Sequence, residues 1–204
     1  MSAYESEEQQ VEALKKWWKE NGVSVVVGAA IGLGAVLGWQ GWQGHLVEKN
    51  AVASQLLEAV VQSDKEQKKI KAQQIFDEYD DTIYADFAAF DLAKDAVNSG
   101  NNDQAADYLQ RVIDRSGDSA IVDLARLRLA RVLLDSGKGA DAEKQLSAIT
   151  SSVYQAEAQA VQGDIALAAG DKKKAKEAYE KALAGKTANS ELLKLKLDDL
   201  AAAN

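Results

Sequence analysis

The chain has 204 residues, carries a formal net charge of −8, and contains neither cysteine nor proline. The absence of cysteine excludes a disulfide framework, a thiol nucleophile and a thiolate metal site. The acidic balance lacks the basic footprint of a nucleic-acid-binding protein, so DNA and RNA are not expected as partners. A chain without proline is typical of packed helices joined by short turns.

Residues 1–22 form the first predicted segment, which is amphipathic. Its apolar residues recur at spacings of three and four, and charged residues occupy the other side. We expect either a short helix lying at the cytoplasmic face of a membrane or the solvated start of the helix that follows. Asn21-Gly22 is the expected break between the two. The apolar residues of this side are Val11, Leu14, Trp17 and Trp18.

Residues 23–42 form the second segment, a predicted transmembrane helix. No Asp, Glu, Lys or Arg occurs between positions 21 and 47, and an apolar run of about 20 residues matches the hydrocarbon core of a bilayer. A cleaved signal peptide is disfavoured, because the leader is acidic and the run is too long. Aromatic anchors flank the run, as at the two interfaces of a lipid bilayer. They are Trp17, Trp18, Trp39 and Trp42.

The lysines around this helix predict its orientation. Lys15, Lys16 and Lys19 precede it, whereas Lys49 is the first Lys or Arg after it. Cationic residues concentrate on the cytoplasmic side of membrane helices. We therefore expect a single-pass protein with a cytoplasmic N-terminus, whose residues 43–204 lie in the periplasm if the source is bacterial.

Glycines within the apolar run predict lateral packing. Gly28 and Gly32 form one Gly-x-x-x-Gly motif, and Gly34 and Gly38 form a second on a different face. Glycine at this spacing allows a second membrane helix to approach closely. Two neighbouring helices are expected, although glycine is also common in membrane helices without such a role.

Residues 43–204 are predicted to form one helical domain, because strand-type alternation is nowhere sustained. Tight turns with capping residues separate the helices, for example at Gly100 and Gly170. The predicted helices cover residues 47–62, 66–79, 84–98, 103–114, 120–135, 139–149, 153–168, 171–184 and 190–202.

A repeat emerges when three turns are superposed. A glycine at 100, 137 and 170 is preceded by a small residue seven positions earlier and followed by an alanine five positions later. A larger side chain comes four positions after each alanine. The pattern resembles the tetratricopeptide repeat, a helical pair whose small residues allow close crossing. The expected fold class is all-α: one N-terminal transmembrane helix followed by a tetratricopeptide-like solenoid, with a divergent hairpin at 47–79 and a C-terminal cap at 190–200.

Such solenoids bind peptides in a groove lined by the first helix of each pair. The resemblance places groove positions in each of the three units. An apolar floor with two cations suits extended or unfolded chains; the alternative is that these residues are core between repeats. The positions are Phe87, Phe90, Lys94 and Val97, then Leu124, Leu127, Arg131 and Leu134, then Glu157, Ala160, Asp164 and Leu167.

Catalytic chemistry is not expected. His45 is the only histidine and lies at the exit of the apolar helix, far from any predicted cleft. A nucleophilic triad would have to use it. We expect no enzymatic activity, no cofactor and no metal.

The combined pattern is similar to one known family. YESEEQQVEALKKWWKENG, a glycine-rich span ending in GWQGW and a degenerate helical repeat resemble the YfgM family of ancillary SecYEG translocon subunits. The resemblance implies an inner-membrane protein that associates with SecYEG and with the membrane-anchored periplasmic chaperone PpiD. It would help to hand nascent or unfolded periplasmic polypeptides to folding factors. A membrane-anchored scaffold for an envelope-assembly or division complex is the alternative.

Overall fold

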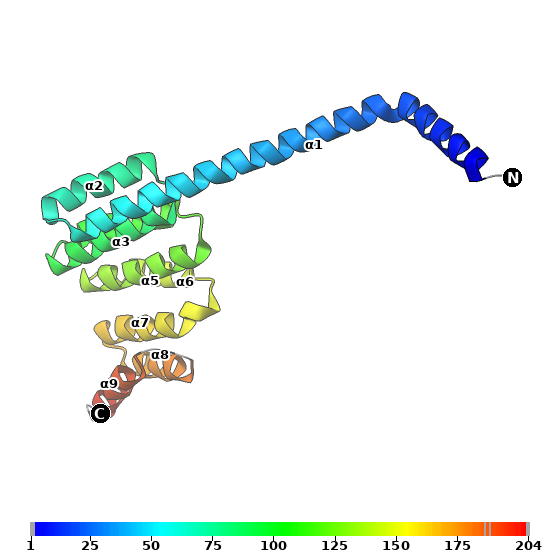
Figure 1. The fold of residues 1–204 in the computed structure, drawn as a ribbon. Helices are drawn as coiled ribbons and strands as arrows, with labels where there is room; N and C mark the ends of the chain where they lie inside the picture. The colour runs from blue at the N-terminus through cyan, green and yellow to red at the C-terminus, as the bar shows by residue number, and fades with distance from the viewer. Residues whose placement is uncertain (1–2, 186, 188, 203–204) are drawn as a thin grey trace. The chain divides into compact units, whose positions relative to one another are not determined.

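A computed structural model describes residues 3–185, 187 and 189–202 of the chain, so the outermost residues of the predicted segments 1–22 and 43–204 lie outside the described part. Within these residues every regular element is a helix, which confirms the all-α class (Figure 1). The elements are α1 (Ala3–Gln62), α2 (Lys65–Glu78), α3 (Ile83–Asn98), α4 (Asn102–Arg115), α5 (Ser119–Asp135), α6 (Gly139–Ser147), the 3₁₀ turn η1 (Ser152–Tyr154), α7 (Gln155–Ala168), α8 (Lys172–Ala184) and α9 (Ser190–Ala202).

The chain divides into two compact units, Met1–Ala51 and Val52–Asn204. The described part of the first unit is helical throughout, so the predicted break at Asn21-Gly22 is wrong. The Asn21 side-chain amide donates to the Trp17 carbonyl oxygen at 3.0 Å, one turn back, and this bond runs along the helix instead of ending it. Helix α1 is long and apolar enough to cross a membrane by length and composition.

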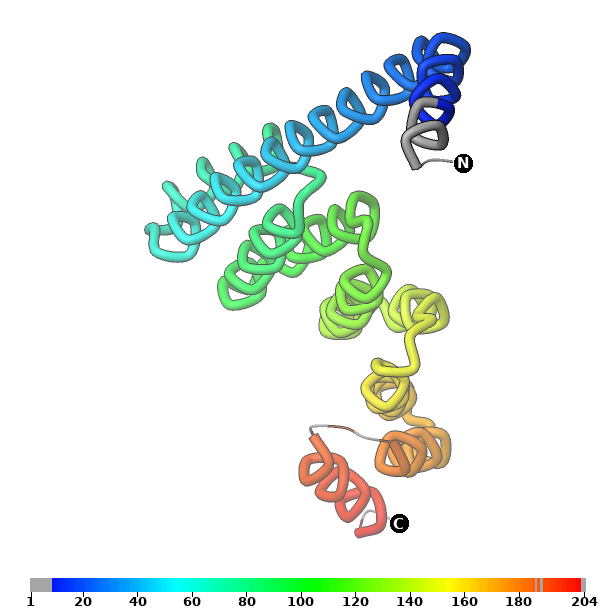
Figure 2. The backbone as a smooth tube through the Cα atoms, turned by 45° about the vertical axis from the view of Figure 1, so that its right-hand side comes forward, coloured from blue at the N-terminus to red at the C-terminus, as the bar shows by residue number. Residues whose placement is uncertain are grey.

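The second unit is a succession of antiparallel helix pairs. The pairs α3 with α4, α5 with α6, and α7 with α8 follow one another along the unit (Figure 2). Each pair turns at a glycine in the left-handed region, with φ of +73° at Gly100, +74° at Gly137 and +80° at Gly170. L-residues with a Cβ adopt this region at a cost, so the three superposed glycines mark equivalent turns.

The predicted repeat positions are buried, which confirms the periodic pattern. Each small residue seven positions before a turn faces a larger side chain of the following helix, and both are inaccessible. The third unit differs from the other two: its small residue is Gly163 instead of an alanine, and its larger residue is Tyr179 instead of a leucine. A Cβ at Gly163 would stand 2.5 Å from Tyr179 Cδ1, so the large ring requires the glycine. The buried pairs are Ala93 with Leu109, Ala130 with Leu146, and Gly163 with Tyr179.

The C-terminal helix α9 covers the last pair, as predicted. Leu193 and Leu200 pack with Tyr179 in a buried cluster. Lys196 adds an ion pair with Asp164 of α7 and lies 5.4 Å from the centre of the Tyr179 ring. The apolar end of the solenoid is thereby withdrawn from water.

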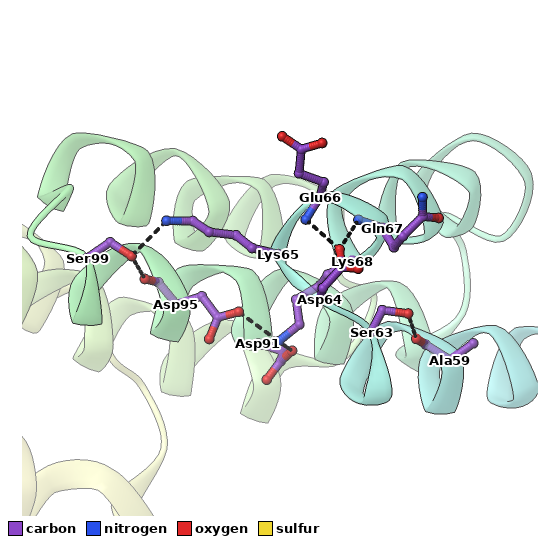
Figure 3. A network of polar contacts seen from close by, with 10 residues as sticks. All are labelled: Ala59, Ser63, Asp64, Lys65, Glu66, Gln67, Lys68, Asp91, Asp95 and Ser99. Atoms are coloured by element: carbon purple, nitrogen blue, oxygen red, sulfur yellow. Dashed lines mark hydrogen bonds and ion pairs between the residues drawn. The ribbon is translucent and has the colours of Figure 1, made fainter.

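A buried ion-pair network holds α2 against α3 (Figure 3). The Lys68 ammonium lies 2.7 Å from Asp91 Oδ2 and 2.7 Å from Asp95 Oδ2, and the residue is only 9% exposed. Asp64 caps α2 by accepting from the backbone N–H groups of Glu66 and Gln67. Two carboxylates satisfy the single buried cation, as burial of a charge requires.

Candidate functional site

The second unit contains an apolar hollow of about 690 Å³. Helix α3 supplies half of its lining residues, α5 supplies four, α4 supplies one, and the end of α1 contributes two aliphatic residues. We call this feature the α3/α5 hollow. Its lining residues are Leu57, Val61, Phe87, Phe90, Asp91, Ala93, Lys94, Val97, Asn98, Leu109, Arg128, Arg131, Val132 and Asp135.

Five of the eight candidate groove residues of the first two units meet in this hollow. Phe87, Phe90, Lys94 and Val97 lie on α3, and Arg131 lies on α5. Phe87 is 41% exposed, whereas Phe90 is 7% exposed and forms part of the floor. Successive turns of α3 place these residues on one face, because positions three and four apart lie on the same side of a helix.

Leu124, Leu127 and Leu134 do not line the hollow. Leu127 is buried in the cluster formed by α5, α6 and α7, Leu134 packs against that cluster, and Leu124 packs against the cluster formed by α1 to α5. The alternative interpretation, core between repeats, therefore describes these three leucines. Repeat spacing alone did not separate them from the hollow, because a solenoid helix contacts neighbours on more than one side.

The third repeat does not extend the hollow. Ala160 packs against the cluster that contains the α9 leucines. Asp164 accepts a hydrogen bond from the Tyr179 hydroxyl at 2.6 Å and pairs with Lys196. Helix α9 thus pairs with one predicted groove position, Asp164, and the hollow is lined by the first two repeats and the end of α1.

Nine of the fourteen lining residues were not among the predicted groove positions, and three of them add apolar surface and a further cation to the hollow. Leu57 and Val61 come from the end of α1, and their spacing of four residues is the signal that an apolar helix face continues to this point. Arg128 lies one turn before Arg131, and its guanidinium carbon is 4.4 Å from the centre of the Phe90 ring. This cation–π geometry holds a positive charge over the floor of the hollow.

The glycines of the apolar helix have open surroundings in the described chain. A Cβ built at Gly28, Gly32, Gly34 or Gly38 would meet no atom within 4 Å. The apolar side chains between them are exposed, for example Ile31 at 68%. The first unit therefore presents two exposed small-residue faces.

The four tryptophans lie in two pairs on the same helix. The ring centroids of Trp17 and Trp18 are 6.4 Å apart, and those of Trp39 and Trp42 are 5.6 Å apart with an edge-on orientation. All four side chains are about half exposed. Amphipathic rings presented in this way suit the two interfaces of a bilayer.

No metal-binding constellation occurs among the described residues, where no group of three or more His, Asp and Glu side chains converges. His45 is exposed on α1. The hollow combines apolar walls with cationic side chains.

These features define a class: a tetratricopeptide-like helical-repeat protein with one helix suited to a membrane. A family profile described as "Tetratricopeptide repeat-like domain" matches residues 15–202. The chain is 33% identical to the ancillary SecYEG translocon subunit of Haemophilus influenzae over 198 residues, which cover 95% of this chain and 97% of that protein. It is 31% identical to the protein of the same name in Escherichia coli over 204 residues, covering 98% and 99% of the two chains.

A third relative of that name, from Aggregatibacter actinomycetemcomitans, is 32% identical over 199 residues, covering 95% of this chain and 97% of that protein. The chain belongs to the family of ancillary SecYEG translocon subunits. No solved structure matches it.

Proposed function

We propose that this protein is a non-enzymatic accessory subunit of the Sec translocon in the bacterial inner membrane. In this proposal residues 23–42 cross the bilayer once, the N-terminus is cytoplasmic, and residues 43–204 lie in the periplasm. The names of the relatives support association with SecYEG. The three lysines before the apolar helix support the orientation.

The helical-repeat domain, residues 43–204, is proposed to receive nascent or unfolded periplasmic polypeptides and to pass them to a membrane-anchored chaperone of the PpiD type. The α3/α5 hollow carries this proposal. Val61, Phe87 and Val97 are 56%, 41% and 41% exposed there, next to cations. A concave apolar surface with few polar groups is a typical binding site, and exposed apolar patches of this kind mark interaction surfaces.

The glycine faces of α1 are proposed to contact membrane helices of the translocon or the chaperone. Close backbone approach is the main means of helix association in lipid, where apolar side chains gain little by leaving the acyl chains. Leucine at Gly28 and Gly32 together should separate the backbones and reduce the recovery of translocon subunits by affinity capture of the full-length protein in mild detergent. Leucine at Gly44, which is equally open and lies away from both glycine faces, is the matched control.

Photo-crosslinking from the same helix distinguishes the two functional classes. Adducts with translocon or chaperone helices support an accessory subunit. Adducts only with a second copy of this chain contradict it and favour a homodimeric scaffold.

Polypeptide capture is tested separately at the hollow. Phe87→Ser removes an exposed aromatic side chain and should weaken binding of a reduced, alkylated protein to the full-length chain, with helicity unchanged by circular dichroism. Phe90 is less suitable because it is mostly buried under Arg128. Val153→Ser, at a residue 72% exposed outside the hollow, is the control. Equal binding by all three proteins would contradict a polypeptide-binding hollow.

A further inference from the structure

The charges of the α3/α5 hollow are unlike those of the domain that contains it. From residue 48 onward the chain has 21 Lys and Arg against 27 Asp and Glu. The hollow is lined instead by three cations and two carboxylates. The cations are Lys94, Arg128 and Arg131, and the carboxylates are Asp91 and Asp135.

One of the two carboxylates is paired with a cation from outside the hollow, which it shares with Asp95. Asp91 lies 2.7 Å from the ammonium of Lys68, which belongs to α2 and is not a lining residue (Figure 3). Burial alone would lower the pKa of Lys68, but the hydrogen bonds and charges of Asp91 and Asp95 outweigh it and raise the pKa. Lys68 therefore stays protonated at neutral pH and holds Asp91.

The cations of the hollow have no such partners in the part of the chain that the structure describes. Among the described residues, no carboxylate forms an ion pair with Lys94, Arg128 or Arg131. Burial and the charge of Arg131 lower the pKa of Arg128, which stacks on Phe90. Two positive charges one helical turn apart repel each other, and a carboxylate placed between them relieves that repulsion.

We propose that the α3/α5 hollow binds polypeptide segments in which a carboxylate lies beside large apolar side chains, and that Lys68 supports this preference by offsetting part of the negative charge of Asp91. The apolar side chains of the segment contact Val61, Phe87 and Val97, and its carboxylate contacts the arginines of α5. Lys68 acts as a positioning residue, because it controls the charge of the hollow through Asp91 without lining it. The inference rests on the polypeptide binding proposed above and specifies which polypeptides are bound.

The test uses the full-length protein in mild detergent and three fluorescent peptides with the same apolar residues. The peptides differ at one central position, which is Asp, Asn or Lys. We expect the Asp peptide to bind about fivefold tighter than the Asn peptide and the Lys peptide to bind weakest, with the differences shrinking at high salt. Arg131→Gln should reduce the preference, and Asp135→Asn should increase it.

The role of Lys68 is tested by a pair of variants. Lys68→Met exposes the charge of Asp91 to the hollow and should remove most of the preference for the Asp peptide. Lys68→Met combined with Asp91→Asn should restore it, which a purely structural role of Lys68 does not predict. Lys144→Met, which breaks an exposed ion pair with Asp141 on α6, is the matched control. If Lys68→Met fails to fold, the Arg131 and Asp135 variants still decide the charge preference.

The outcomes separate this inference from the proposed function. Binding of none of the peptides would contradict polypeptide capture itself. Equal binding of all three, or tightest binding of the Lys peptide, would overturn the charge preference and leave polypeptide capture standing. A preference that is unchanged in Lys68→Met would overturn the role of Lys68.

Discussion

Gly163 and Tyr179 provide the most direct test of how the third repeat is packed. In Gly163→Ala the new Cβ would stand 2.5 Å from Tyr179 Cδ1 and 3.0 Å from Cζ, whereas carbon atoms pack at about 3.5 to 4.0 Å. The ring cannot easily retreat, because Tyr179 is fully buried and its hydroxyl donates to Asp164 at 2.6 Å. Overpacking costs about 1 to 3 kcal/mol, and the better helix propensity of alanine returns up to about 1. We expect a net loss of about 1 to 2 kcal/mol in the free energy of unfolding.

The sign of the effect should reverse when the ring is removed. Tyr179→Leu leaves space beside Gly163 and loses the hydrogen bond to Asp164, so it destabilises the protein on its own. Adding Gly163→Ala to this variant gives the third repeat the same alanine and leucine that the first repeat has at Ala93 and Leu109. The double variant should therefore recover part of the lost free energy of unfolding. Urea unfolding of the full-length protein in mild detergent, followed by far-ultraviolet circular dichroism, measures all four proteins of this cycle.

Gly139→Ala is the control for this cycle, because its Cβ would lie 3.6 Å from Ile165 Cγ2, an ordinary contact. We expect a change within about 0.5 kcal/mol. A neutral or stabilising Gly163→Ala in the presence of Tyr179 would refute the close-packing explanation of the glycine.

Three further predictions concern the backbone and the buried charges. Gly100→Ala should lower the free energy of unfolding by about 1 kcal/mol in the same urea assay, because φ is +73° and a Cβ there meets no other atom within 4 Å. Burial, opposed by a hydrogen bond from Ser116, raises the pKa of Asp86 above 3.8, so its ionised form costs stability at neutral pH. Asp86→Asn should therefore raise the urea midpoint at pH 7, with the gain disappearing as the pH falls towards 3.8. Against the effect of burial, pairing with Asp91 and Asp95 raises the pKa of Lys68 above 10.5 in the folded state, so the Lys68 charge contributes fully to the free energy of unfolding below pH 10.5. This contribution is lost as the pH rises through the higher pKa of the folded state, so the urea midpoints of wild type and Lys68→Met should converge in alkaline titrations.

Local signals sufficed to predict the helices of the second unit. Gly100, Gly137 and Gly170 are equivalent in the structure because each ends the first helix of a pair in a left-handed turn. The small residues seven positions before them face the following helix, as their spacing indicates. Turn chemistry and helical periodicity act over a few residues, and both are therefore visible in the chain itself.

The first unit shows a limit of such signals. Asn21-Gly22 has the composition of a helix end, and yet α1 continues through it. Glycine is tolerated inside a helix at a cost of about 1 kcal/mol, and the long apolar run on its C-terminal side continues the helix. A capping residue is a local preference, and the length of the surrounding helical segment can override it.

By itself the sequence determined the all-α class, the apolar helix with its tryptophan and glycine positions, and the repeat, because these depend on contacts along one helix or across one turn. Only the tertiary structure decided which groove positions stay open. Leu127 is core, Asp164 is paired with Lys196 of α9, and Phe87, Lys94 and Arg131 meet Arg128 and Val61 in one hollow. Lys68 forms an ion pair with Asp91, which lies 23 positions away in the chain. Such contacts depend on how separate helices pack, and spacing along one helix carries no information about them.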